Sequence, residues 1–88
     1  MKPLNFAILK YFTTGVEACR ADVQEALKGE YGSFRAFKDK AMGEALMTAT
    51  ANGLLEESRL DLDKDGNLVI YYRALEDGIA AINSYIKD

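Results

Sequence analysis

The sequence predicts an α+β fold in which residues 1–88 form a single domain. Hydrophobic residues make up 49% of the chain, which is enough for a packed core at this length. Apolar residues recur at helical spacing in four segments, and the stretch around Asp65-Gly66 alternates as paired strands do. The expected order is therefore helix, short strand, helix, helix, strand, strand, helix.

The first helix is expected over residues 4–14. Its apolar stripe consists of Leu4, Ile8, Leu9, Tyr11 and Phe12. Asn5 is a candidate N-cap, and Gly15 is a natural stop because glycine tolerates the left-handed conformation that ends many helices. The residues that follow, VEAC at 16–19, are interpreted as either a short strand or a plain connector.

Two further helices are expected before the strands. The segment RADVQEALKG, residues 20–29, carries an apolar stripe and is expected to end at Gly29. Ser33 is a candidate N-cap for the next segment, which runs to the stop signal Asn52-Gly53. Gly43 interrupts that segment and costs about 1 kcal/mol relative to alanine. The segment is therefore either one helix or a short helix followed by a main helix beginning near Asp39.

Residues 61–66, DLDKDG, resemble the opening of an EF-hand calcium loop. Such a loop needs an oxygen ligand at its ninth position and a bidentate glutamate at its twelfth. Those positions hold Val69 and Tyr72 here, and the chain continues as LVIYY, which is typical of a strand. We therefore interpret the motif as a β-hairpin turn, and we expect no metal ion and no cofactor.

A three-residue loop, Lys64-Asp65-Gly66, gives the hairpin a consistent register. The expected pairs are Asp63 with Asn67, Leu62 with Leu68, Leu60 with Ile70, and Ser58 with Tyr72. One face then collects the apolar residues Leu60, Leu62, Leu68, Ile70 and Tyr72. A two-residue loop would mix polar and apolar residues on both faces, and the hydrophobic pattern normally fixes register.

Val69 and Tyr71 fall on the other face of this hairpin, among the charged residues. Two interpretations stay open for them. They are either a half-covered flank packed by another element or part of a protein-interaction surface, since contiguous exposed apolar residues mark interfaces. The chain is expected to close with a helix whose stripe is Leu75, Ile79, Ile82 and Ile86.

Composition argues against an enzyme. The chain has no histidine, which removes the commonest general base and metal ligand. Its one cysteine, Cys19, is interpreted as a small buried residue. No apolar run is long enough to span a membrane and no signal peptide is evident, so we expect a cytoplasmic protein that does not enter a membrane.

The expected order and hairpin resemble a winged helix-turn-helix domain. ALMTATANGLLEES, residues 45–58, is similar to the end of a recognition helix entering the first wing strand of MarR- and PadR-type regulators. YYRALEDG, residues 71–78, is similar to the second wing strand running into a last helix. The family's Tyr-Arg-Leu-Thr junction is altered, because Ala74 and Leu75 replace Leu and Thr. The small size also resembles short winged-helix proteins of bacterial chromosomes and phages, such as the YjcQ type.

The resemblance implies three helices, a two- to three-stranded antiparallel wing and a C-terminal helix. It also implies that the third helix would enter the DNA major groove by its N-terminal part, with basic residues holding phosphates. Transferred to this sequence, the DNA-binding candidates are Arg20, Arg35, Lys38, Lys40 and Lys64. For each of them the alternative is an ordinary surface charge.

Charge argues for weak DNA binding at most. The net charge is −3, and residues 45–88 carry four Lys/Arg against eight Asp/Glu. Asp61, Asp63 and Asp65 surround the hairpin turn and would repel phosphates, so binding to double-stranded DNA would be weak and salt-dependent. The sequence supports a transcriptional regulator or accessory factor, or alternatively a winged-helix module that binds a protein partner or a second copy.

Overall fold

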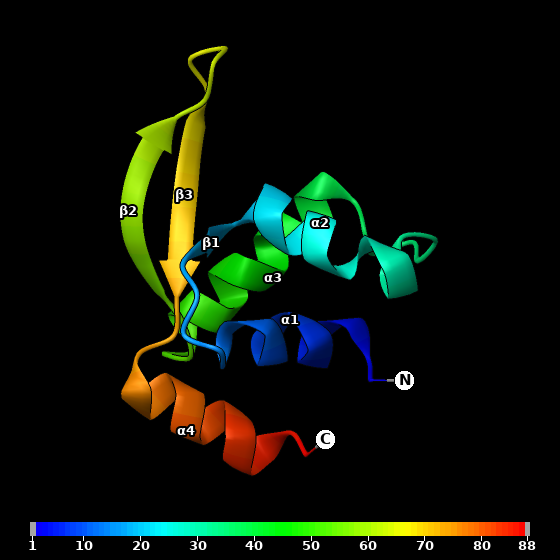
Figure 1. Ribbon diagram of the computed structural model, residues 1–88, viewed down its shortest axis with the longest axis vertical. Coiled ribbons are helices and arrows are strands. Elements are labelled where there is room, and N and C mark those ends of the chain that lie inside the picture. The colour runs from blue at the N-terminus through cyan, green and yellow to red at the C-terminus, as the bar shows by residue number, and fades with distance from the viewer. Residues whose placement is uncertain (1, 88) are drawn as a thin grey trace.

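The computed structural model describes residues 2–87 as an α+β fold with four helices and a three-stranded antiparallel sheet (Figure 1). The sheet order is β1-β3-β2, so β3 lies between the short β1 and the edge strand β2. The elements in chain order are α1 (Leu4–Phe12), β1 (Ala18–Cys19), α2 (Arg20–Tyr31), α3 (Asp39–Ala51), β2 (Glu56–Leu62), β3 (Leu68–Arg73) and α4 (Glu76–Tyr85).

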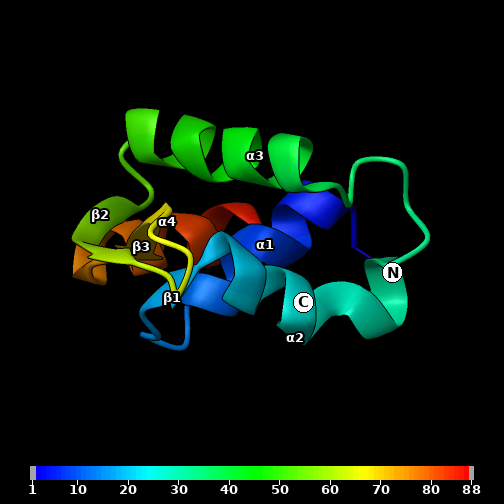
Figure 2. The ribbon, with the colours of Figure 1, turned by 90° about the horizontal axis from the view of Figure 1, so that it is seen from above.

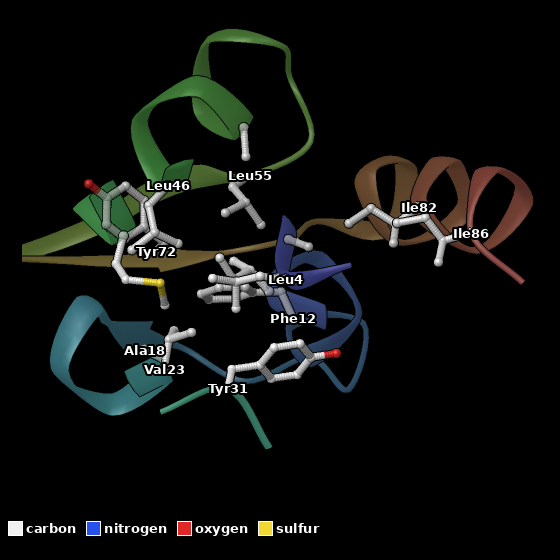
Figure 3. Close-up of a cluster of buried hydrophobic side chains, with 14 residues drawn as sticks. Leu4, Phe12, Ala18, Val23, Tyr31, Leu46, Leu55, Tyr72, Ile82 and Ile86 are labelled. Atoms are coloured by element: carbon white, nitrogen blue, oxygen red, sulfur yellow. The ribbon is translucent and has the colours of Figure 1, made fainter. Parts of the chain in front are cut away.

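The core lies where the helices meet the base of the sheet (Figure 3). Each helix contributes side chains that are almost fully buried, among them Phe12, Val23, Leu46 and Ile82. The buried tyrosine of α2, Tyr31, donates a hydrogen bond of 2.5 Å from its hydroxyl to the main-chain oxygen of Lys2. The helices are therefore held together by apolar packing, and the polar tip of Tyr31 has a partner.

The boundaries of the first two helices differ from the expected ones. Pro3, not Asn5, is the N-cap of α1. α2 continues through Gly29 to Tyr31, because burial of Tyr31 in the core holds the last turn. At the start of α2, Cys19 and Asp22 form a capping box in which the Asp22 carboxylate accepts the Cys19 N–H at 3.1 Å.

A single helix over residues 33–52 is wrong. Of the alternative, the main helix beginning near Asp39 is confirmed, whereas the short helix before it is wrong. The chain between α2 and α3 makes two successive turns. The N–H of Phe34 donates a hydrogen bond to the main-chain oxygen of Tyr31, and the N–H of Phe37 donates one to the main-chain oxygen of Phe34. Lys38 then adopts an extended conformation as the N-cap of α3, so Ser33 caps no helix.

The three-residue hairpin loop is confirmed. Gly66 has a φ of 81°, a left-handed conformation that favours glycine. Its N–H donates a hydrogen bond to the main-chain oxygen of Asp63 at 3.0 Å. The pairs Leu62–Leu68 and Leu60–Ile70 are as expected.

The expected pair Ser58–Tyr72 is wrong, because a bulge between Glu57 and Arg59 sets Glu57 opposite Tyr72. The Ser58 hydroxyl instead donates to the Glu17 carboxylate at 2.6 Å. The extra residue in β2 therefore serves a contact with the chain between α1 and β1.

The C-terminal helix docks closely against the start of the hairpin. Ile82 and Ile86 are buried as their spacing predicts, whereas Leu75 is the exposed N-cap of α4 rather than a core residue. A Cβ at Gly78 would lie 2.4 Å from the main-chain oxygen of Leu54. This close approach requires glycine, and it fixes α4 beneath the base of the hairpin.

A candidate binding groove between the hairpin and α3

One face of the hairpin begins in the core and ends in solvent. Tyr72, at the base of β3, is buried, whereas Leu68 on the same face is 62% exposed. Leu60 and Leu62 of β2 lie opposite this stretch and are 61% and 65% exposed. Figure 1 shows why, because the distal half of the hairpin rises beyond the helices that cover its base.

This exposed leucine face forms one wall of an open groove of about 600 Å³. The opposite wall comes from Met47 and Gly43 of α3 and from Ala21 near the start of α2. Met47 is itself 60% exposed. Figure 2 shows the hairpin seen from above, with α3 and the start of α2 passing beside it.

We call this surface the leucine groove. It is defined by Leu62, Leu68 and Met47, which line the open space, and by Leu60, which continues the same hairpin face beside them.

The aspartates beside the groove are held in their charged form by local hydrogen bonds. The main-chain N–H of Asn67 lowers the pKa of Asp63 below its ordinary value, with further contributions from neighbouring loop N–H groups. One side-chain oxygen of Asp63, Oδ1, accepts hydrogen bonds from the main-chain N–H groups of Asp65 and Asn67, each at 2.9 Å. The N–H of Leu62 likewise lowers the pKa of Asp61. These carboxylates therefore shape the turn and keep it acidic at neutral pH.

Within residues 2–87 no group of three or more His, Cys, Asp or Glu side chains is arranged to hold a metal ion. The residue types of the stretch 61–66 also suit the hairpin turn, because aspartate and glycine are residues that close hairpin loops.

The expected DNA-binding residues fall into two places. Lys64 is at the hairpin tip, Arg20 and Lys40 lie at the starts of α2 and α3, and Arg35 and Lys38 lie in the chain between these helices. Arg20 is already engaged, because its guanidinium pairs with Asp39 at 2.9 Å and also donates to the Gln24 side chain. It links the start of α2 to the start of α3, which is a structural task.

Arg35, Lys38 and Lys40 are exposed and make no ion pair with any other residue of the described chain. We call these three residues the basic patch. Only Lys40 lies within α3, and the exposed positions further along that helix include Glu44 and Met47. The exposed positions of α3 therefore include the carboxylates of Asp39 and Glu44 as well as the cation of Lys40.

The expected interaction residues Val69 and Tyr71 are half-buried rather than exposed. The Arg59 guanidinium lies 3.8 Å from the centre of the Tyr71 ring, and it also pairs with Glu17 at 2.8 Å and Asp61 at 3.0 Å. This network partly covers the Tyr71 ring, but Val69 and Tyr71 also line the open groove, so they stay part of the candidate binding surface. The sequence pattern assigned the leucines of this groove to one apolar face of the hairpin, and alternation does not show how far that face projects from the rest of the fold.

Comparisons with known proteins leave the geometry as the sole guide to function. No family model, no curated protein and no solved structure matches the chain. No helix among residues 2–87 has the length and apolar character needed to cross a membrane.

Proposed function

We propose that this chain is a winged-helix module that binds protein through the leucine groove. The winged-helix assignment is supported by the element order and by the antiparallel pairing of the short β1 with β3, which is itself paired with β2. In this assignment α2 and α3 are the helix-turn-helix and the β2–β3 hairpin is the wing. The layout specifies a fold, so the argument for protein binding comes from the groove.

The exposed leucine face carries the proposal. Leu60, Leu62, Leu68 and Met47 each expose about three fifths of their surface in or beside one groove. Their exposed surfaces add up to roughly 400 Å², the size of the largest apolar patch on a typical monomer, and such patches are often functional. Leaving that surface in water gains nothing for folding, so binding is the function that explains it.

The charge distribution favours protein over DNA as the ligand. The hairpin tip carries Asp61, Asp63 and Asp65, and the outward face of α3 carries Glu44. A phosphate backbone lying in this groove would meet Asp61, Asp63 and a leucine wall, with Arg20 as a lining cation. A protein surface with apolar side chains and flanking basic groups meets no such penalty.

DNA binding is the second candidate function, and the basic patch is the observation that favours it. Arg35, Lys38 and Lys40 are exposed at the end of α3 that would approach DNA in a winged helix. Three cations without additional support give weak affinity that falls steeply with salt. This candidate predicts that contacts concentrate on the patch and spare the leucine groove.

Site-specific photocross-linking in cells that produce the protein separates the two functions. A benzophenone amino acid is placed at Leu62 in the groove, at Lys40 in the basic patch, or at Ala80 on the exposed side of α4 as the matched control. The proposal predicts protein adducts at position 62 that are absent at position 80. Nucleic-acid adducts at position 40 with no protein adducts at position 62 would overturn it.

A further inference from the structure

We propose that the occupant of the leucine groove is a second copy of this chain, bound in a twofold symmetric dimer. The hairpins of the two copies pack with their leucine faces together, and each acidic hairpin tip meets the basic patch of the partner. This inference rests on the proposed function, because it names the protein that fills the groove.

The shape of the chain permits this arrangement. In Figure 1 the hairpin rises on one side of the molecule, and α3, whose Gly43 and Met47 line the groove, passes on the other side. A twofold rotation about the viewing direction of Figure 1 turns the partner's hairpin downward beside the first. Its leucine face then meets the leucine face of the first copy, and its tip comes down towards the start of α3. Because the axis is twofold, every such contact is made twice.

The apolar surface is self-complementary in this dimer. Leu60, Leu62 and Leu68 project from one face of a short hairpin, and two such faces pack as two small sheets do. The groove side chains supply on the order of half of the roughly 800 Å² per partner that a standard stable interface buries. The half-buried Ile70 and the turn residues around the groove supply further contact area.

The charges are complementary in the same arrangement. The basic patch and the side chain of Asp65 have no ion-pair partner inside the described part of the chain. Placing one hairpin tip over the partner's basic patch brings Asp63 and Asp65 to Lys40 and its neighbours, with Lys64 as the one like charge between the two aspartates. A single set of contacts thereby accounts for the exposed leucines, the acidic tip and the unpaired cations, without any component that the sequence does not supply.

Pairing through the open edge of β2 is a poorer way to join two copies. The bulge between Glu57 and Arg59 interrupts the regular ladder of that strand, and Arg59 and Asp61 place charges along it. Bulges and charges are the devices that keep edge strands from pairing with another chain. The leucine face has no such protection, so the dimer contact belongs there.

Sedimentation equilibrium of the full chain tests the dimer, over protein concentrations from micromolar to millimolar and at low and high salt. The wild type is expected to approach twice the monomer mass and to dissociate more readily at high salt. Leu62→Lys is expected to weaken the dimer by tenfold or more, because it places a charge in the centre of the contact. Leu75→Lys, a substitution of an exposed leucine on α4, is the matched control and should leave the dimer unchanged.

A charge exchange tests the orientation of the two copies. Lys40→Glu and Asp65→Lys should each weaken the dimer several-fold. The double variant should recover most of the loss, because the exchanged charges would again be opposite in sign where position 40 of one copy faces position 65 of the other. Circular dichroism confirms that each variant is folded.

Two results would overturn the inference. One is a wild type that stays monomeric at millimolar concentration, and the other is a Leu62→Lys variant that dimerises as well as Leu75→Lys. Protein adducts at position 62 from a chain that is monomeric would overturn the dimer alone and leave the proposed function standing.

Discussion

Tyr72 and Leu68 lie on the same face of β3, four residues apart, yet Tyr72 is 4% exposed and Leu68 is 62% exposed. Burial therefore changes along one strand, because the helices cover only the base of the hairpin. The same apolar pattern stabilises the fold at one end and offers a contact surface at the other. This division predicts that substitutions at the two ends have different consequences.

Truncating the distal leucines should cost little stability. Leu68→Ser removes a side chain that is mostly in water, so its effect on the free energy of unfolding should stay within about 0.5 kcal/mol for the monomer. Leu46→Ala, at a fully buried position of α3, should cost about 2–5 kcal/mol. Urea denaturation at low protein concentration measures both. A loss at Leu68 comparable to that at Leu46 would show that the distal face is packed.

Glycine substitutions should separate the docking of α4 from general helix propensity. Gly78→Ala should destabilise the chain by about 1–3 kcal/mol, because the new methyl group collides with the main chain at Leu54. Gly29→Ala is the matched control, since its Cβ would meet nothing within 4 Å, and it should stabilise α2 by about 1 kcal/mol. Thermal unfolding compares the two variants. Equal effects of the same sign would contradict the close approach of α4 to the hairpin.

The network around Glu17 should make stability depend on acidity. Hydrogen bonds from Ser58 and Arg59 lower the pKa of the Glu17 carboxyl below its ordinary value of 4.5. A lowered folded-state pKa means that the unfolded chain binds the proton more readily. The contribution of the ionised Glu17 carboxylate to the stability of the fold is then fully present above pH 4.5 and is lost as the pH falls through the folded-state pKa. Glu17→Gln should flatten this part of the stability–pH curve, measured by urea denaturation at a series of pH values. Parallel curves for wild type and variant would rule out the network as a source of stability.

The two loop aspartates should differ in their effect on the hairpin. Asp63→Ala removes the acceptor for the N–H groups of Asp65 and Asn67, so amide hydrogen exchange in residues 60–70 should quicken several-fold. Asp65→Ala removes a side chain for which the loop holds no hydrogen-bond or ion-pair partner among residues 2–87, and it should leave exchange unchanged in the monomer. Millimolar calcium should alter neither variant nor the wild type. Slower amide hydrogen exchange of these residues in the presence of calcium would instead show that the aspartates form a cation site.

Local patterns predicted much of the fold because they depend on neighbouring residues. Helical stripes and the Asp-Gly turn predicted the element order and the distal hairpin register. The register is well specified because a slip of one residue would move Leu60 and Leu62 to the other face of the sheet. The bulge was missed because it depends on Glu17, which lies 41 residues from Ser58 in the sequence. The leucine groove was missed for a related reason. Alternation assigns residues to a face, but the helices that cover the face are set by tertiary packing.

Chemical-shift mapping by nitrogen-15 NMR tests the central claim, that the leucine groove binds protein and that the chain does not bind DNA. The chain is titrated with a mixed-sequence DNA duplex at low salt, and in a separate series it is diluted without DNA. The account predicts that dilution shifts the signals of residues 60–70 and the start of α3, whereas DNA produces no localised shifts. Shifts confined to residues 33–44 and the hairpin tip on adding DNA, fading as salt is raised, with spectra unchanged by dilution, would contradict it.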